Sequence, residues 1–548
     1  MRRFLIVLVA AVIAGGCTKV QSGPSSPAAT PGGRHPWTIP HVLRVDVPAE
    51  PNSLNPILTA NTVEAALARL TFDGLVSVDA TGRHDVPILA AAVPTLQNGG
   101  VSRDGLTITY HLRHGVRWQD GAPFTSADVK FTVAAILNNR NNVISRTGFT
   151  LVKSVGTPDP YTAVFHMKHA YAPAVDDLFG ESDSPYEILP AHLLSKYPDI
   201  NHVPFNGQPI GTGPFILKRW QRGDHLEYVA NPHYFRGKPK LDRIVVHFVT
   251  DENTALNQLR AHELDWQFEP QPQEYKDLKP LTDVRSILVQ GNQYERIQMN
   301  TRHPPLDDVR VRRAIAYAIN LQRLVDDLTF GSAAVADQDL PPFMWAHATN
   351  VTVYPYDPRK AGELLDSAGW KLGPDGFRHK SGRRLSLDLA YDVENATRRR
   401  GVVLVQAMLR KAGIAIEPKP YLAQLFFAQY QLGGILQTGK FDLGWSGWVA
   451  GIDPDNSTNV TCAAIPPNGQ NNMFYCNHAL DALENSALST FDRTARKADY
   501  ERIEQILSRD EPQVDLWWPR QIQAINPDLT GFTPNPVTET WNAYQWDI

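Results

Sequence analysis

Hydrophobic and polar residues alternate along this chain with two different periods, and the period changes from one segment to the next. In residues 106–113, LTITYHLR, the side chains of Leu106, Ile108, Tyr110 and Leu112 fall on one face. This period of two predicts a half-buried strand. Two further segments are predicted as strands, HLEYVANP (225–232) and RIVVHFV (243–249).

Other segments carry their apolar residues at helical spacing. ENTALNQLRAHEL (252–264) and DDVRVRRAIAYAINLQRLV (307–325) each predict one helix with an apolar face. YDPRKAGELLDSAGW predicts another, with Asp357 as N-cap, Pro358 in the first helical position and Gly369 as its C-terminal stop. Since strands and helices interleave along the chain, we expect an α/β architecture.

One charged turn, GVRWQDGAPFTSADVKF (115–131), could be a catalytic loop or part of the scaffold. Asp120-Gly121 is a turn signal. Thr125 and Asp128 have the spacing of a capping box, in which each side chain satisfies a free amide of the first helical turn. The segment pairs no nucleophile with a base, so we interpret it as a strand, a turn and a capped helix.

The chain length and charge limit the choice of function. A chain of 548 residues is expected to form two to four domains, at roughly 150 residues per domain. Its 53 basic and 57 acidic residues give a net charge of −4. There is no basic excess of the kind that nucleic-acid binding requires, so no nucleic-acid partner is expected.

The N-terminus has the form of a targeting segment. Residues 1–16 combine two arginines with a short apolar stretch and are predicted to be a signal peptide. Ala14-Gly15-Gly16-Cys17 resembles a bacterial lipobox, with alanine in place of the usual leucine. This predicts lipidation of Cys17 and membrane anchoring, followed by a flexible Ser/Pro/Gly-rich tether over residues 17–41. The alternative is ordinary secretion with an incidental cysteine.

Two more cysteines follow, Cys462 and Cys476. In an exported protein they predict a disulfide. The loop between them is close to the ~15-residue loop for which the chain-entropy model gives a stabilisation of ~3 kcal/mol. Two separate buried thiols are the alternative.

The search for catalytic and metal-binding patterns favours no site. His262-Glu263 lacks the second histidine of a zinc-protease motif, and no cysteine pair has zinc-finger spacing. Ser446 lies in GWSGW, which is not a G-x-S-x-G elbow. Gly211–Phe215 lacks the end of a phosphate loop, and Asp307-Asp308 stands at a helix start, where capping explains it. We therefore expect no enzyme, no cofactor and no metal, but a protein that binds.

Seven segments, taken together and in order, resemble the extracellular solute-binding proteins of ABC importers, family 5, the peptide/nickel-binding type. They span nearly all of the chain after the tether. They are LTFDGLV, GVRWQDGAPFTSADVKF, PIGTGPFIL, VANPHYFRGKPKLDRI, PPLDDVRVRRAIAYAI, YDPRKAGELLDSAGW and FDLGWSGWVAGIDPDN.

The resemblance implies a two-lobe periplasmic-binding-protein-like fold of the class II type, with a two-strand hinge. Lobe I would comprise residues 42–70, 191–290 and 512–548. An extra subdomain of this lobe would span 71–190, and lobe II would span 291–511. The ligand would lie between the lobes, which close because it contacts both.

The resemblance also implies ligand-binding residues. Peptide-binding members carry an aspartate three residues after the Gly-Trp pair, which binds the free amino terminus of the peptide. Here Gly451 stands three residues after Trp448, and the next acid is Asp453. Either Asp453 replaces the missing anchor, or the ligand has no free amino terminus, which we favour because an unpaired buried ammonium is costly. Trp445 and Trp448 would contact the ligand or, alternatively, pack inside lobe II.

The predicted function is an extracytoplasmic receptor that captures a peptide-like or other small polar solute and delivers it to the permease subunits of an ABC importer. We expect a monomer, lipid-anchored on the outer face of the cytoplasmic membrane. A ligand sensor or adaptor without transport is one alternative, and a secreted hydrolase is another. The fold cannot choose among peptides, metal chelates and sugars.

Overall fold

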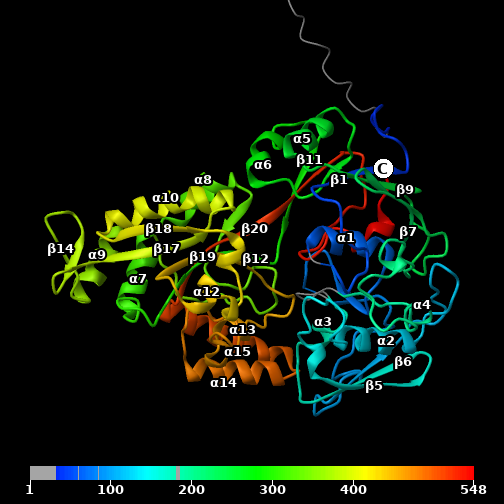
Figure 1. Cartoon of the computed structure of the whole chain (residues 1–548), viewed down its shortest axis with the longest axis horizontal. Coiled ribbons are helices and arrows are strands. Elements are labelled where there is room, and N and C mark those ends of the chain that lie inside the picture. Colours follow the sequence, from blue (N-terminus) through cyan, green and yellow to red (C-terminus); the bar gives the residue numbers. More distant parts are fainter. Residues whose placement is uncertain (1–32, 60, 84, 181–185) are drawn as a thin grey trace, which may run out of the picture.

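A long mixed β-sheet runs through the molecule and joins its two lobes (Figure 1). The computed structural model describes residues 33–59, 61–83, 85–180 and 186–548. In spatial order the strands of this sheet are β18 (Ala415–Tyr421), β17 (Ser386–Asp392), β19 (Leu443–Val449), β12 (Gln293–Met299), β20 (Gln513–Ile525), β10 (Trp266–Gln267), β1 (Val42–Val47), β9 (Arg243–Phe248), β8 (His225–Ala230) and β7 (Phe215–Gln221), while β11 (Arg285–Gln290) and β13 (Ala333–Val335) also pair with β20.

The thirteen-residue strand β20 belongs to both lobes. Its first half pairs antiparallel with β12, where Glu295 is opposite Trp517, and its second half pairs antiparallel with β11, where Leu288 is opposite Ile522. Earlier in the sequence, the chain passes from lobe I to lobe II between β11 and β12, through Gly291. Two adjacent stretches of extended chain therefore connect the two ends of the sheet, and here the family resemblance predicts the two-strand hinge.

Lobe II packs helices against the β12, β17, β18 and β19 end of the sheet (Figure 1). Its core gathers apolar side chains of the strands and helices, among them Ile297, Leu389 and Val405. Its helices are α7 (Val309–Ala318), α8 (Leu321–Thr329), α9 (Pro358–Ser367), α10 (Ala396–Lys411), α11 (Ala423–Phe426), α12 (Ile435–Thr438), α13 (Ser457–Val460), α14 (His478–Ser489) and α15 (Arg493–Asp510). A separate three-stranded sheet comprises β14 (Lys371–Leu372), β15 (Arg378–Lys380) and β16 (Arg383–Arg384).

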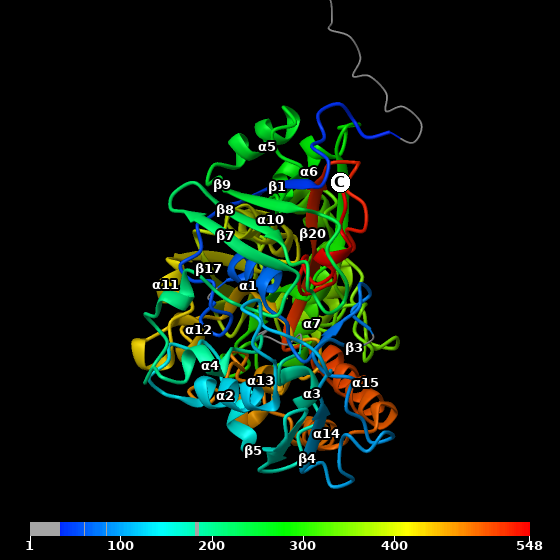
Figure 2. The same cartoon turned by 90° about the vertical axis from the view of Figure 1, so that its right-hand side faces the viewer.

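Lobe I surrounds the other end of the large sheet. Its helices are α1 (Thr62–Thr71), α5 (Glu252–Arg260) and α6 (Pro272–Leu278). Its core includes Leu43 on β1, Trp266 on β10 and Trp546 near the C-terminus, so segments from both ends of the chain share one core. Figure 2 shows β1 and the C-terminal segment lying close to β20 on this side of the molecule.

The extra subdomain of lobe I has its own core, which includes Tyr110 and Phe165. It combines the sheet of β4 (Thr107–His111), β6 (Thr162–Met167) and β5 (Val152–Asp159) with α2 (Ser126–Leu137), α3 (Ala174–Asp177) and α4 (Ala191–Leu194), beside the pair β2 (Val76–Val78) and β3 (Asp85–Pro87). It meets lobe II far from the hinge, where the Ala172 amide donates to the Leu488 carbonyl at 2.7 Å. The two lobes are thus also in contact outside the hinge.

The charged turn before α2 is part of this scaffold. The Thr125 amide donates to the Asp128 carboxylate at 2.8 Å, which caps the first turn of α2. The same carboxylate accepts from the Ala191 amide at 2.9 Å and so fixes α4 against α2. The indole of Trp118 is buried beside it and donates at 3.4 Å. The polar residues of this segment therefore stabilise the start of α2 and its contact with α4.

The predicted helix over residues 307–325 is two helices, and this part of the prediction was wrong. The chain leaves the helix after Ala318, and Asn320 caps the start of α8 by accepting from the Arg323 amide at 3.0 Å. The apolar spacing continues through the break, so periodicity does not reveal it. By contrast, α9 begins and ends as predicted: Asp357 accepts from the Lys360 amide at 2.9 Å, and Gly369 has a φ of +88°.

The predicted tether overlaps the folded body at its end. His35 and Thr38 both bind the carboxylate of Asp528, and Trp37 stacks on His262 with 4.0 Å between the ring centroids. Hence the flexible segment cannot extend to residue 41. The signal peptide and Cys17 lie outside the described residues. In the part of the chain that the structure describes, no helix is long and apolar enough to span a bilayer.

Candidate ligand-binding cleft

The cavity beside the hinge is lined by both lobes and has a volume of about 790 Å³. Lobe I contributes Glu269 and Gln271, the hinge contributes Gly291 and Gln521, and lobe II contributes the start of α10. Cavities of roughly 300–1,000 Å³ at interfaces between domains are typical of small-molecule sites. Since any movement of the lobes about the hinge changes its width, we take this cavity as the candidate ligand-binding cleft.

The lobe II wall of the cleft is the N-terminal turn of α10. The Asn395 side chain caps this turn by accepting from the Arg398 amide at 2.9 Å. Arg399 and Arg400 also line the cleft and are exposed. A helix N-terminus carries partial positive charge, so this wall favours anionic or polar acceptor groups of a ligand.

Behind this wall lies a buried ion-pair network centred on Arg398. Its guanidinium donates to both oxygens of Glu295 at 2.7 and 3.0 Å and to Asp392 at 3.1 Å. These two carboxylates hold the pKa of Arg398 above its usual value, in spite of its burial. Glu295 lines the cleft, but its oxygens are already bound. We infer that it fixes the strand β12 to α10 and is not free to bind a ligand.

The lobe I wall contains a pair of acids, the partly buried Glu269 and the buried Glu539. The two carboxyl groups are hydrogen-bonded to each other, and Gln523 donates to Glu539 at 3.2 Å. Burial, and for Glu539 also the neighbouring Glu269, raises the pKa of both groups. Glu269 lines the cleft in a left-handed backbone conformation with a φ of +44°. This wall therefore brings a polar acid pair to the cleft.

Trp445 was expected to contact the ligand or to pack inside lobe II, and the structure places it in the core. Its side chain is fully buried, its ring meets Trp517 edge-on at 5.9 Å, and its indole nitrogen donates to Glu295 at 3.0 Å. A buried tryptophan usually needs a hydrogen-bond acceptor for its indole N–H, and Glu295 provides one here. This burial favours the alternative in which Trp445 packs inside lobe II, and a contact of Trp445 with the ligand stays a prediction.

Two alternatives were open for the missing amine anchor: either Asp453 replaces it, or the ligand has no free amino terminus. Asp453 is buried, and Arg496 donates to both of its oxygens at 2.7 Å. Asp453 also accepts from the Asp455 amide at 3.1 Å. A ligand amine would have to compete with these donors, and the role of Asp453 as an amine anchor stays a prediction. Gly451 offers no carboxylate in its place.

Trp448 lies at the end of β19 and is partly buried. It packs beside Tyr294 and Trp518, and the guanidinium of Arg296 lies 5.6 Å from its ring centroid. With Asp453 it lines a separate cavity of about 10 Å³. A ligand contact of Trp448 remains a prediction.

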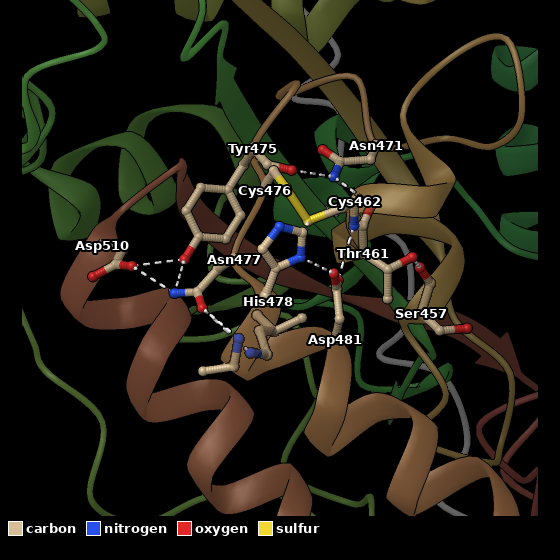
Figure 3. The surroundings of a disulfide bond; sticks show 12 residues. Ser457, Thr461, Cys462, Asn471, Tyr475, Cys476, Asn477, His478, Asp481 and Asp510 are labelled. Atoms are coloured by element: carbon tan, nitrogen blue, oxygen red, sulfur yellow. Dashed lines mark hydrogen bonds and ion pairs between the residues drawn. A yellow bond between two sulfur atoms is a disulfide. The ribbon is translucent and has the colours of Figure 1, made fainter.

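Figure 3 shows the disulfide between Cys462 and Cys476, which has an S–S distance of 2.09 Å. It joins the segment after α13 to the start of α14. His478 lies beside it and its ring pairs with Asp481 at 3.2 Å. Cys462, Cys476 and His478 would satisfy the spacing of a metal site, but the disulfide occupies both sulfur atoms.

The residues that build the cleft walls were not found from the sequence. Glu295 and Arg398 are 103 positions apart, and the Glu269–Glu539 pair joins the middle of the chain to its C-terminus. No local pattern connects positions so far apart.

Comparison with known proteins gives the family. The family model described as "Bacterial extracellular solute-binding proteins, family 5 Middle" matches residues 86–465. The oligopeptide-binding protein AppA of Bacillus subtilis is 28% identical over 448 residues, covering 81% of each chain. The glutathione-binding protein GsiB of Salmonella typhimurium is 29% identical over 491 residues, covering 89% of this chain and 90% of GsiB.

Solved structures agree. NikZ of Campylobacter jejuni, in complex with Ni(L-His), has a TM-score of 0.73 and 27% identity, covering 93% of this chain and 99% of NikZ. AppA of B. subtilis, in complex with a nonapeptide, has a TM-score of 0.71 and 25% identity, covering 92% and 98%. With the α/β two-lobe fold and the cleft at its hinge, these matches show that the chain belongs to the family 5 extracellular solute-binding proteins of ABC importers.

Proposed function

We propose that this protein captures a peptide-like solute in the hinge cleft and delivers it to the permease of an ABC importer. The observation that carries the proposal is the cavity of about 790 Å³ with walls from both lobes. A ligand that contacts both walls at once binds the closed form more tightly than the open form. The permease can then distinguish loaded from empty protein by its shape.

We further propose that the ligand lacks a free amino terminus. Gly451 stands where the anchoring acid of peptide-binding members is expected, and Asp453 is committed to Arg496. On the lobe II wall, Arg399 and Arg400 favour a carboxylate or another acceptor group. Blocked or cyclic peptides and other carboxylates fit this set of groups better than ordinary peptides do.

The proposal is tested by mass spectrometry of small molecules that co-purify with the native protein, followed by calorimetry. Matched peptide libraries with free and with N-acetylated amino termini are then compared. The proposal predicts binding of acetylated peptides at least as tight as that of free ones. A clear preference for free amino termini would contradict the second part of the proposal but would leave the first part standing.

Anchoring at Cys17 is the remaining part of the proposed function. Small residues precede Cys17, and a Ser/Pro/Gly-rich segment follows it. Several acyl chains, each buried methylene contributing ~0.8 kcal/mol, would hold the protein at the membrane. The Cys17→Ser variant is expected to move from the membrane fraction to the soluble fraction. If this variant stays in the membrane fraction, the anchor is not at Cys17.

A further inference from the structure

A second cavity lies within lobe II and shares no lining residue with the cleft. Its volume is about 400 Å³. It is bounded by the junction of α7 and α8, by residues 352–356, by α15 and by the first half of β20. A cavity of this size is much larger than a packing defect in a well-packed domain, where voids rarely exceed one water molecule.

The lining of this cavity combines acidic and apolar residues. Within the described part of the chain, no lysine or arginine lines it. Its apolar residues include Val335, Leu507 and Val514. Its acidic residues are five, Asp337, Asp339, Glu504, Glu511 and Asp515.

These carboxylates have too few donors. The amide group of Asn456 donates to Asp339 at 3.1 Å and to Glu504 at 3.4 Å, and the carboxyl groups of these two acids are also hydrogen-bonded to each other. Asp515 accepts one bond, from Gln513 at 2.8 Å. Glu511 is 93% buried, and among the described residues its carboxylate has neither a hydrogen-bond donor nor an ion-pair partner. A buried carboxylate without a partner is costly to the folded state.

The nearest arginines do not donate hydrogen bonds to these carboxylates. Arg296 lowers the pKa of Asp339 and Asp515 through its charge, but its two terminal nitrogens donate to Tyr294, Gln513 and Asn459, and among the described residues its buried Nε has no hydrogen-bond partner. On α7, Arg312 and Arg313 act on Glu511 in the same way, but they donate to backbone carbonyls. Burial and mutual repulsion still raise the pKa of four of these acids above the usual value.

The spacing of the acids indicates an extended cation rather than a metal ion. Among the described residues, only Cys462, Cys476 and His478 bring three metal-ligand atoms within 4.8 Å of one another. The carboxylates of the cavity form no such cluster, and apolar side chains line the same cavity. A linear ligand with positive groups on a hydrocarbon chain matches both kinds of residue.

We propose that this cavity binds an alkyl diamine or polyamine, with its ammonium groups on the acids around Glu511 and Asp515 and its methylene chain on Leu507 and Val514. The site is independent of the cleft and of the solute that the cleft takes. Helix α15 leads directly into β20, and β20 forms part of the hinge. A ligand bound in this cavity therefore stabilises the lobe II end of the hinge.

The test is calorimetry on the mature chain with 1,5-diaminopentane, and with 1,5-pentanediol as a neutral probe of matched length. We expect saturable binding of the diamine and none of the diol at pH 8. We expect at least tenfold weaker binding in Glu511→Gln and in Asp515→Asn. Glu501→Gln, at an outward-facing acid of α15 that pairs with Lys497, is the matched control and should bind as the wild type does.

Hydrogen–deuterium exchange on the wild-type chain provides a readout that does not depend on the variants folding. The proposal predicts that the diamine slows exchange in residues 335–339 and 504–515. Equal binding of diol and diamine, tighter binding of Ca²⁺ at the same residues, or protection confined to other segments would each overturn it. So would the absence of diamine binding at millimolar concentration.

Discussion

Arg496 donates to both oxygens of Asp453, at 2.7 Å each, inside lobe II. Both residues are buried, and the pair joins the segment after β19 to the first turn of α15. Asp453 is the acid nearest to the expected anchor position, and two N–H groups of Arg496 and the Asp455 amide already occupy acceptor positions on it. The same pair gives a direct prediction for stability.

We predict that Asp453→Asn destabilises the fold by about 3–5 kcal/mol, because it leaves the Arg496 guanidinium buried without a counter-ion. Urea unfolding measures this. Asp327→Asn removes an exposed ion pair with Arg323 and is the control, with little expected change. A stable Asp453→Asn protein that has lost affinity for its solute would instead assign Asp453 to ligand binding.

We predict that Gly401→Ala destabilises lobe II, although alanine normally favours a helix over glycine by ~1 kcal/mol. A methyl group at residue 401 would meet the ring of Trp445 and lie 2.9 Å from Leu328. Overpacking of this kind costs about 1–3 kcal/mol. Adding Trp445→Phe should recover part of the loss, which a double-mutant cycle measures. Strictly additive effects of the two changes would show that the contact is absent.

The disulfide gives a third prediction. Replacing Cys462 and Cys476 with serine should lower the unfolding free energy by about 3 kcal/mol, the value expected for a loop of roughly 15 residues. A reductant should lower the stability of the wild-type protein to the level of this variant and should leave the variant unchanged. Two reactive thiols in unfolded protein that was never reduced would argue against the bond.

Asp46 makes stability depend on pH. It is buried on β1, and burial raises its pKa from 3.8 to about 7. The folded protein therefore holds a proton that the unfolded chain has lost, and the contribution of this group is complete below pH 3.8 and disappears as the pH rises to about 7. Between these two pH values, this group lowers the free energy of unfolding by at most about 1.4 kcal/mol per pH unit. In Asp46→Asn this part of the pH dependence should vanish; an unchanged slope would show that other groups cause it.

The elements of the fold that depend on nearby residues could be predicted from the sequence. The cap formed by Thr125 and Asp128 and the limits of α9 at Asp357 and Gly369 are set within a few positions, so the local pattern contains the information. The break at Asn320 was missed because the apolar spacing continues through it.

The contacts of the candidate site join distant positions, and no periodicity records them. Arg496 and Asp453 are 43 residues apart, and Trp445 and Glu295 are 150 apart. The sequence could not tell which of the candidate side chains already had partners inside the fold. Consequently Trp445 and Asp453 could be named as candidate ligand contacts, but their buried partners could not be named.

The most direct test of a two-lobe receptor is small-angle scattering from the same protein, first freed of co-purified solutes and then mixed with the solute that co-purification identifies. Closure of the lobes about the β11–β12 and β20 hinge should reduce the radius of gyration, and the unfolding temperature should rise together with it. A profile and an unfolding temperature that both remain unchanged, with that solute and with broad peptide mixtures, would contradict the account.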